Sequence, residues 1–169
     1  MNEGVKEEQK EKEILTILEE NARTSEKEIA KMVGIAEDEV KKIISELENA
    51  GIIRKYKVMI NYEKAGRETV QALIDIKLSP ERNTGYDSVA ERISRFPEVT
   101  SVRLVSGAYD LSVVVDGSTM REVAYFVAEK IAPLEQVRNT VTHFLLKTYK
   151  ENGEIYEKEE KGERLAVSL

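Results

Sequence analysis

Two helix-boundary signals in the first third of the chain constrain its fold more than any other feature. The run Ser25-Glu26-Lys27-Glu28 is a capping box, in which the serine hydroxyl and the Glu28 carboxylate reciprocally satisfy backbone donors at a helix start. Gly34 is the residue type that most easily takes the left-handed conformation just past a helix end. The sequence therefore predicts a short helix between these signals, with an apolar side made of Ile29, Ala30 and Val33.

Helical periodicity is also present on both sides of this short helix. Residues 7–21 predict a helix with Ile14 and Leu18 on one face, and residues 37–50, after the turn Gly34-Ile35-Ala36, predict a third with its inner face at Val40, Ile44 and Leu47. Two helices joined by a tight glycine turn and preceded by a supporting helix are typical of a helix-turn-helix, whose second helix can enter a major groove. An ordinary three-helix bundle is the alternative.

A basic β-type stretch follows the third helix. Residues 51–61 carry Arg54, Lys55 and Lys57 within four positions, and we expect them to form a wing that contacts the DNA backbone. The alternative is a solvated edge strand, because charged residues, lysine above all, protect sheet edges. Residues 1–61 are thus predicted to be a winged helix-turn-helix DNA-binding domain, followed by a linker at residues 62–68.

The second half of the chain changes to strand periodicity. Apolar residues alternate with mostly polar ones at Val70, Ala72, Ile74, Ile76 and Leu78. Helices are predicted at residues 86–96 and, from a capping box at Thr119 and Glu122, up to Pro133; further strands are predicted at residues 99–106, 111–117 and 137–147. The order β-α-β-β-α-β predicts a ferredoxin-like domain over residues 69–150, with both helices on one face of an antiparallel sheet. The fold class is α+β.

The other face of this sheet has no predicted helix to cover it. We place Leu73 there, with Leu145 or Leu146, and expect a second subunit to bury the face, which gives at least a homodimer. Residues 151–169 are a charged C-terminal extension. Its last part, residues 164–169, has the strand character needed to add an edge strand to its own or a partner's sheet.

Composition excludes several classes of protein. The chain has no cysteine, so disulfides, thiol catalysis and cysteine-based metal sites are absent, and we expect no cofactor or metal. No segment approaches the roughly 18 apolar residues of a transmembrane helix, and the polar N-terminus is unlike a signal peptide, so we expect a cytoplasmic protein with no membrane partner. The net charge of −6 argues against a general polyanion binder, so DNA binding must come from geometry.

Over residues 8–150 the sequence resembles the Lrp/AsnC (leucine-responsive or asparagine-type) family of transcriptional regulators. Three runs carry the resemblance: residues 39–53 are similar to the family's recognition helix and the start of its wing, residues 106–111 to its Gly-x-Tyr-Asp signature, and residues 137–142 to its fourth strand. The resemblance implies a RAM-type sensing domain, an amino acid or related metabolite as effector, and dimers that commonly assemble into tetramers or octamers. It also implies double-stranded DNA as a partner.

The resemblance places the effector beside the Gly-x-Tyr-Asp loop. It assigns effector contacts to Gly107, Tyr109 and Asp110 in the loop and to Thr140 and Thr142 on the facing strand. A glycine turn presents backbone donors to a carboxylate, and a carboxylate such as Asp110 can receive an ammonium. The alternative for Asp110 is a turn residue that bonds its own backbone.

The candidate DNA-binding residues come from the outer face of the third helix and from the wing. They are Lys41, Lys42, Ser45, Asn49, Arg54, Lys55 and Lys57. The lysines can contact phosphate or guanine, whereas the serine and the asparagine can bond base edges or the backbone.

The third helix departs from the family pattern in its charge. It carries five acidic residues against two lysines, and the family usually has arginines around the positions of Ile43 and Glu46 and a serine at Ala36. Arginine's bidentate fork is missing here, and the acidic groups repel phosphate. We therefore expect DNA binding weaker than is typical for the family, raised by the avidity of a dimer.

Two other functions compete with a DNA-binding regulator. Siroheme decarboxylases resemble this architecture and use histidine, but His143 is the chain's single histidine, so one chain holds no histidine pair for metal or acid–base chemistry. A DNA-independent metabolite sensor or co-regulator, whose helical domain contacts protein, is suggested by the acidic third helix. We expect a DNA-binding regulator that is not an enzyme.

Overall fold

The computed structural model describes residues 3–62, 64–67, 69–79 and 85–156. The chain divides into two compact units, Met1–Met59 and Ile60–Leu169, and each is described by itself. The strand expected at residues 164–169 lies outside the described residues.

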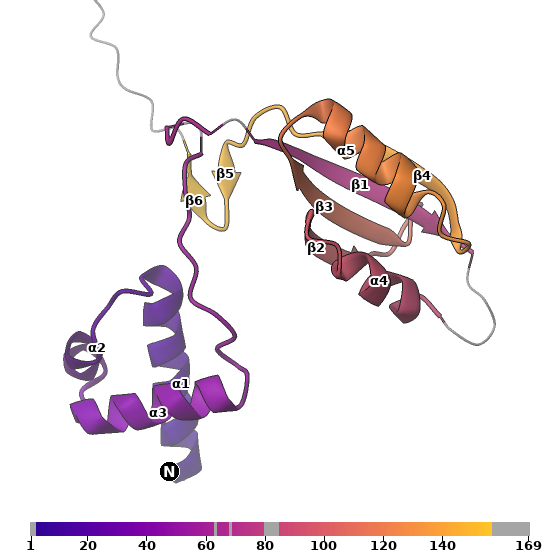
Figure 1. Ribbon diagram of the computed structural model, residues 1–169. Coiled ribbons are helices and arrows are strands. Elements are labelled where there is room, and N and C mark those ends of the chain that lie inside the picture. The colour runs from indigo at the N-terminus through magenta and orange to yellow at the C-terminus, as the bar shows by residue number, and fades with distance from the viewer. Residues whose placement is uncertain (1–2, 63, 68, 80–84, 157–169) are drawn as a thin grey trace, which may run out of the picture. The chain divides into compact units, whose positions relative to one another are not determined.

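The N-terminal unit consists of three helices, α1 (Glu3–Glu20), α2 (Glu26–Val33) and α3 (Glu37–Asn49) (Figure 1). The capping box of α2 is confirmed, because the Ser25 hydroxyl accepts from the Glu28 backbone N–H at 3.3 Å and the Glu28 carboxylate accepts from the Ser25 backbone N–H at 3.0 Å. Gly34 ends the helix with φ of 76°, a conformation that favours glycine. One core joins the three helices, made of Ile14, Leu18, Ile29, Ala30, Val40, Ile43 and Leu47.

The buried side of α3 differs by one residue from the sequence prediction. Ile43 is only 5% exposed, whereas Ile44 is half-buried at the margin of the core. Residues 40, 43 and 47 are spaced by three and four positions, as expected for one face of a helix. Residues 40, 44 and 47 have the same spacings in the reverse order, so the sequence alone does not distinguish the two faces. Contact with α1 and α2 decides between the two faces.

The β-type wing expected at residues 51–61 is not present as a strand. Residues 54–61 form no helix, turn or strand. A strand exists only where a second strand supplies its hydrogen-bonding partners, and the described part of the chain offers none to this segment. The prediction of a strand here was therefore wrong for a single chain.

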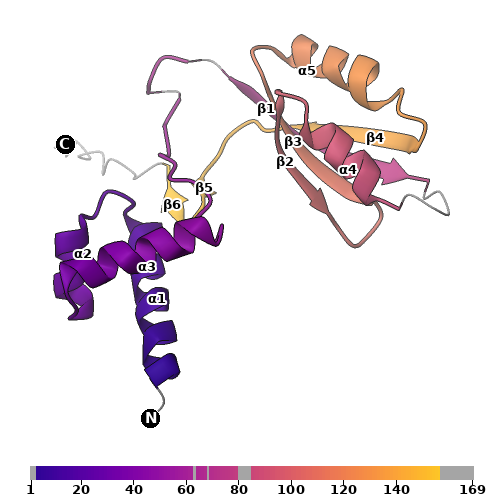
Figure 2. The ribbon, with the colours of Figure 1, turned by 60° about the horizontal axis from the view of Figure 1, so that its bottom comes forward.

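The second unit contains the predicted β-α-β-β-α-β order. It consists of β1 (Val70–Leu78), α4 (Asp87–Ser94), β2 (Val99–Leu104), β3 (Leu111–Gly117), α5 (Met120–Phe126) continued by the π-helical turn η1 (Val127–Ile131), and β4 (Val137–Phe144). The strands form an antiparallel sheet in the order β2-β3-β1-β4, and α4 and α5 cover one face (Figure 2). The ferredoxin-like prediction is confirmed.

The core of this unit lies between the sheet and the two helices. Alternate residues of β1 point into it, among them Ile74 and Ile76, and Val123 and Phe126 enter it from α5. Gly117 allows α5 to approach β3, because a Cβ there would lie 2.8 Å from the Val123 side chain.

The capping box predicted for α5 is formed in a modified way. The Thr119 hydroxyl accepts from the Glu122 backbone N–H at 3.1 Å, as expected. The Glu122 carboxylate, however, accepts from the backbone N–H of Ser118 at 2.8 Å rather than from that of Thr119. The helix start is still stabilised from both sides.

A short hairpin, which the sequence analysis missed, follows the main sheet. β4 ends at Phe144, before the expected end at residue 147, and β5 (Lys150–Glu151) and β6 (Glu154–Ile155) then pair with each other. The dipeptide Asn152-Gly153 between them is a strong sequence signal for a two-residue hairpin turn. The hairpin therefore occupies the start of the extension expected at residues 151–169.

Candidate functional site

The outer face of α3 is the candidate surface for a nucleic acid. Its polar residues Lys42, Ser45 and Asn49 are exposed, as the sequence predicted. The Asn49 amide donates to the Ser45 hydroxyl at 3.5 Å, so these two residues form one polar group on successive turns of the helix. Both side chains can act as donors and acceptors toward base edges.

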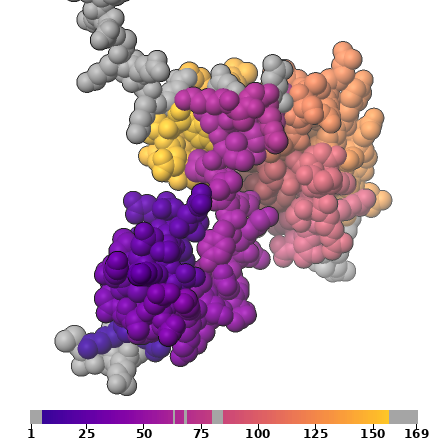
Figure 3. Space-filling view, turned by 60° about the vertical axis from the view of Figure 1, so that its left-hand side comes forward, coloured from indigo at the N-terminus to yellow at the C-terminus, as the bar shows by residue number. Residues whose placement is uncertain are grey.

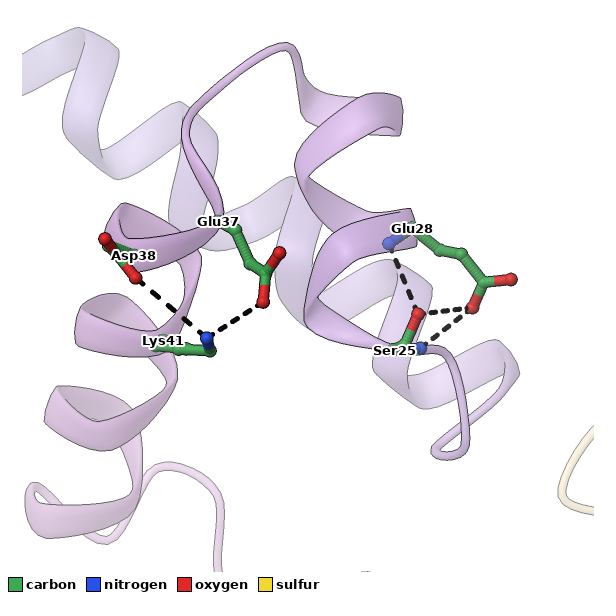
Figure 4. Close-up of polar contacts among 5 residues, drawn as sticks. All are labelled: Ser25, Glu28, Glu37, Asp38 and Lys41. Carbon is green, nitrogen blue, oxygen red and sulfur yellow. Dashed lines mark hydrogen bonds and ion pairs between the residues drawn. The ribbon is translucent and has the colours of Figure 1, made fainter.

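Both lysines of α3 are engaged in ion pairs within the helix itself. The Lys41 ammonium lies 2.8 Å from Glu37 and 3.9 Å from Asp38 (Figure 4), and the Lys42 ammonium lies 3.7 Å from Glu46. The hydrogen bond with Glu37 raises the pKa of Lys41, and the same contact lowers the pKa of Glu37. A phosphate therefore has to compete with carboxylates for these two cations.

Ile43 does not mark a vacant arginine position on the DNA side. Its side chain belongs to the core of the N-terminal unit, so this position does not add to the outer face of the helix. Glu46, in contrast, is exposed and carries a negative charge on the outer half of the helix. The acidic character of this surface thus comes from Glu46 and from the first turn of α3.

The basic residues after α3 are placed differently from those on the helix. Arg54, Lys55 and Lys57 are exposed and form no ion pair with any residue that the structure describes. Tyr56, between them, donates a hydrogen bond to the Glu48 carboxylate at 3.0 Å and so anchors the start of the segment to α3. These three cations are therefore not compensated by an ion pair within the described residues, in contrast to the two lysines of α3.

A hollow of about 560 Å³ lies between α1, α2 and α3. It brings Arg23, from the loop before α2, into the same lining as Lys41 and Ser45. Sequence analysis did not select Arg23, because a single arginine in a loop carries no pattern. The hollow adds one cation to the surface beside α3.

The loop between β2 and β3 holds the predicted effector residues. Gly107 has φ of 141°, Tyr109 is half-buried, and Asp110 is fixed to the end of β1. One oxygen of the Asp110 carboxylate accepts from the Lys77 ammonium at 3.1 Å and the other from the Leu78 backbone N–H at 2.8 Å. The bond from Leu78 is the main reason that the pKa of Asp110 is lowered. The carboxylate is thus already paired within the chain.

The two threonines on β4 lie on the helix-covered side of the sheet. Thr140 is opposite Ile76 and Thr142 is opposite Ile74, and directly opposed residues of antiparallel strands share one side. Asp110 donates its backbone N–H to the Ile76 carbonyl at 2.9 Å, so this loop and Thr140 meet at the same residue of β1. Thr142 lies one step further from the loop.

The open face of the sheet carries a mixed surface. Leu73 lies there, as predicted, in one row with Val114 of β3 and His143 of β4. Leu145 donates its backbone N–H to the carbonyl of Gln71 near the start of β1. The His143 side chain is 54% exposed, and its Nε2 lies 3.3 Å from the Asp75 carboxylate. The chain's single histidine is therefore part of a surface pair.

Comparison with known proteins identifies the chain. Residues 71–155 match the family described as the Lrp/AsnC ligand binding domain, and residues 7–54 match winged helix-turn-helix DNA-binding domains. The chain is 50% identical over 161 residues to YugG, an HTH-type transcriptional regulator of Bacillus subtilis. The matched region covers 95% of this chain and 97% of that protein. The chain belongs to the Lrp/AsnC family.

Another relative and two solved structures are also similar to the chain, the structures in fold. The chain is 33% identical over 132 residues to the HTH-type transcriptional regulator PH0140 of Pyrococcus horikoshii, across 78% of this chain and 81% of that one. Among solved structures, the regulator NMB0573 of Neisseria meningitidis in complex with L-Met has a TM-score of 0.70 at 24% identity, covering 84% of this chain and 91% of that one. AsnC of Escherichia coli has a TM-score of 0.68 at 23% identity, covering 85% and 94%.

As an Lrp/AsnC protein, the chain is a transcriptional regulator with a DNA-binding and a ligand-binding domain. The winged helix-turn-helix match ends at residue 54, and the ligand-binding match begins at residue 71 and includes the hairpin β5–β6. Lys55 and Lys57 fall between the two matches. In the part of the chain that the structure describes, no helix is long and apolar enough to span a bilayer and no cluster of acidic or histidine residues could hold a metal.

Proposed function

We propose that this Lrp/AsnC regulator binds double-stranded DNA through two parts of its N-terminal domain, one that contacts bases and one that contacts phosphates. The polar face of α3, with Lys41, Lys42, Ser45 and Asn49, reads the major groove, and the basic residues after it hold phosphate. The DNA-binding domain comprises residues 1–61. The linker comprises residues 62–68, and the sensing domain comprises residues 69–150. Because its target is chromosomal DNA, we place the protein in the cytoplasm and assign it no enzymatic activity.

The observation that carries this proposal is the difference in ion pairing between the two sets of cations. Lys41 and Lys42 have carboxylate partners on α3, whereas Arg54, Lys55 and Lys57 have none among the described residues. A cation without a protein partner releases a counterion from DNA without first giving up an ion pair. The three residues after α3 therefore supply most of the electrostatic affinity.

Salt dependence separates these contributions. Each phosphate contact adds about 0.9 to the slope of log K against log salt concentration. We expect the double variant Lys55→Ala/Lys57→Ala to lose close to two such contacts, and the matched double variant Lys41→Ala/Lys42→Ala to change the slope much less. Fluorescence anisotropy with a fragment of the protein's own promoter region, titrated at several salt concentrations, measures both slopes. Equal slopes for the two variants contradict this division.

We further propose that the sensing domain binds an amino acid or a related metabolite at the end of β1. The shared fold with the Neisseria regulator, whose structure contains L-Met, supports this class of effector. Gly107 supplies backbone donors for the effector carboxylate, and Tyr109, Thr140 and Thr142 line the site. Asp110, which is held by Lys77 and Leu78, shapes the loop.

Calorimetry of the full chain with each of the twenty amino acids tests this effector proposal. Heat of binding from one amino acid or a small group, reduced in a Thr140→Val variant, is the expected result. Thr100→Val on the opposite edge of the sheet is the control, because Thr100 bonds the Val114 carbonyl far along the register from Ile76. Binding that is equal in both variants removes Thr140 from the site.

A protein-binding co-regulator is the second candidate, and the internal ion pairs of α3 favour it. A helix whose two lysines are paired with its own carboxylates, and which carries three further acidic residues, presents a net negative surface that suits a protein partner better than DNA. Selection of genomic fragments with the purified chain, with and without amino acids, distinguishes the two candidates. Retention of a defined set of fragments supports the DNA-binding proposal, and retention of none supports the co-regulator.

A further inference from the structure

Lys42 and Glu46 form an exposed pair of opposite charges on α3. Their side chains are 70% and 59% exposed, and the Lys42 ammonium lies 3.7 Å from the Glu46 carboxylate. Figure 3 shows the surface of the three-helix unit to which they belong, coloured indigo to purple. Residues four positions apart lie one above the other on a helix face, so this pair presents a donor and an acceptor side by side.

This pair is the weaker of the two lysine pairs on α3. The Lys41 ammonium lies 2.8 Å from Glu37, in the favourable order with the acidic residue first. The pair of Lys42 with Glu46 is longer and has the reverse order. An exposed pair of this kind contributes a factor of only about two to an equilibrium constant, whereas one correct base pair in a binding site contributes about fivefold or more. Contacts with bases therefore outweigh the pairing of Lys42 with Glu46.

The major groove offers few partners to the Glu46 carboxylate. An ionised carboxylate only accepts hydrogen bonds, and among the base edges only the amino groups of cytosine (N4) and adenine (N6) donate them. In adenine the acceptor N7 lies beside N6 and repels a carboxylate, whereas cytosine has no acceptor beside N4 on this edge. Glu46 therefore favours cytosine over the other three bases.

The Lys42 ammonium favours guanine, the base that pairs with cytosine. An ammonium only donates hydrogen bonds, and guanine presents the two acceptors O6 and N7, whereas thymine presents O4 beside a methyl group. Cytosine N4 donates to guanine O6, so these two atoms lie about 3 Å apart in one base pair. The charged ends of Lys42 and Glu46 are 3.7 Å apart, which suits a donor and an acceptor that neighbour each other.

We propose that Lys42 and Glu46 together read one C·G base pair in the major groove. Glu46 accepts from the cytosine amino group, and Lys42 donates to the guanine of the same pair. The two opposite charges stay beside each other in this complex, so the carboxylate repels the phosphates less than an isolated one would. The inference rests on the proposed binding of DNA through α3, and it makes Glu46 a specificity-determining residue.

The base preference of the full chain tests this contact. Binding sites are selected from a random-sequence duplex library with the wild-type chain and with Glu46→Ala, and the variant is expected to lose a C·G preference at one position of the site. Fluorescence anisotropy with duplexes that differ only at this position should show a wild-type preference for C·G of about fivefold or more. Glu46→Gln should move the preference toward A·T, because a glutamine amide pairs with adenine N6 and N7.

Two further variants separate a shared base pair from a general effect of charge. Lys42→Met is expected to reduce the C·G preference at the same position as Glu46→Ala. Glu48→Gln is the control, because residues two apart point to opposite sides of a helix and Glu48 lines the hollow instead. Its amide oxygen can still accept from the Tyr56 hydroxyl. This control is expected to leave every base preference unchanged.

Three outcomes overturn the inference alone. They are an unchanged base preference in Glu46→Ala, a loss of preference in Lys42→Met at a different position, and a shift in Glu48→Gln equal to that in Glu46→Gln. A wild-type chain that retains no duplex overturns the proposed DNA binding and the inference with it. Failure of the base contact and failure of the proposed function are therefore distinct results.

Discussion

Asp110 fixes the loop between β2 and β3 to the last residues of β1. Its carboxylate is 14% exposed and accepts hydrogen bonds from Lys77 and Leu78, and its backbone N–H donates to Ile76. Charge-assisted bonds of this kind are among the stronger ones in proteins. A residue that the family signature marks for an effector is thus also a structural link between two strands.

The link makes a prediction for pH. Because the pKa of Asp110 is lowered in the folded chain, its contribution to stability is complete above the unfolded pKa of about 3.8 and is lost as the pH falls through the lower folded value. We expect Asp110→Asn to lower Tm at pH 7, and the gap to wild type to shrink toward about pH 3. Thermal melts across this range measure the gap. Asp116→Asn on the open face is the control, and a gap that is constant with pH contradicts the prediction.

The start of α2 illustrates how one side chain fixes a helix boundary. The Ser25 hydroxyl accepts from the Glu28 backbone N–H and supplies a bond that the first turn of a helix otherwise lacks. We expect Ser25→Ala to reduce the free energy of unfolding by about 1 kcal/mol. Urea denaturation followed by circular dichroism measures the change. A Ser25→Ala protein as stable as the wild type would indicate that the hydroxyl at residue 25 plays no capping role.

At the scale of the element, α3 has acidic residues that stabilise its first turn but no side chain that caps its start. Ala36 has the extended conformation of an N-cap residue but offers no side-chain hydrogen bond, and Glu37, Asp38 and Glu39 lie in the first turn. Acidic residues there interact favourably with the helix dipole. The same residues reduce the positive potential that a DNA-reading helix needs. Acidic residues at this end therefore increase helix stability but lower DNA affinity.

Ala36→Ser therefore tests whether α3 can be improved without touching its charge. The backbone of residue 36 is already in the capping conformation, so a serine hydroxyl should add a bond to the first turn and raise the free energy of unfolding by about 1 kcal/mol. Ala50→Ser at the other end of the helix, where the backbone is helical, is the matched control and should give no gain. Chemical denaturation of both variants measures the difference, and a gain from Ala50→Ser equal to that from Ala36→Ser would argue against capping.

At the scale of the whole molecule, the uncovered face of the sheet calls for a second subunit. Leu73, Val114 and Val141 lie on this face between polar pairs such as His143 with Asp75 and Gln71 with Asp116. An apolar centre with a polar rim is the usual anatomy of a protein interface. We propose that this face joins two copies into a dimer, the basic unit for tetramers or octamers.

Leu73→Asp tests the sheet-face dimer. A carboxylate at the centre of a self-complementary face would be repeated in both copies and buried without a partner, which strongly disfavours association. Sedimentation velocity should show a shift from dimer toward monomer for this variant. Met120→Asp, 51% exposed on α5, should leave the dimer intact. A Leu73→Asp protein that sediments as wild type would remove this face from the interface.

The order and type of the main elements follow from the sequence because each rests on neighbouring residues. The capping box at Ser25, Gly34 and the alternation from Val70 to Leu78 act locally, and the structure has a helix start, a helix end and a strand at these places. The hairpin β5–β6 was also within reach of the sequence through Asn152-Gly153. These features depend on periods and backbone preferences that the chain carries in itself.

Tertiary structure decided which side chains are buried and which partners they bond, because these contacts join residues that are distant in sequence. Packing against α1 and α2 buried Ile43 rather than Ile44, and the pairing of β1 with its neighbours gave the Asp110 carboxylate to Lys77 and Leu78 and turned Thr140 toward the helices. The segment after α3 has strand periodicity but no strand, because a strand requires a partner and the described part of the chain supplies none. Local patterns fix which elements can form, whereas the partners of each side chain and strand depend on the assembled fold.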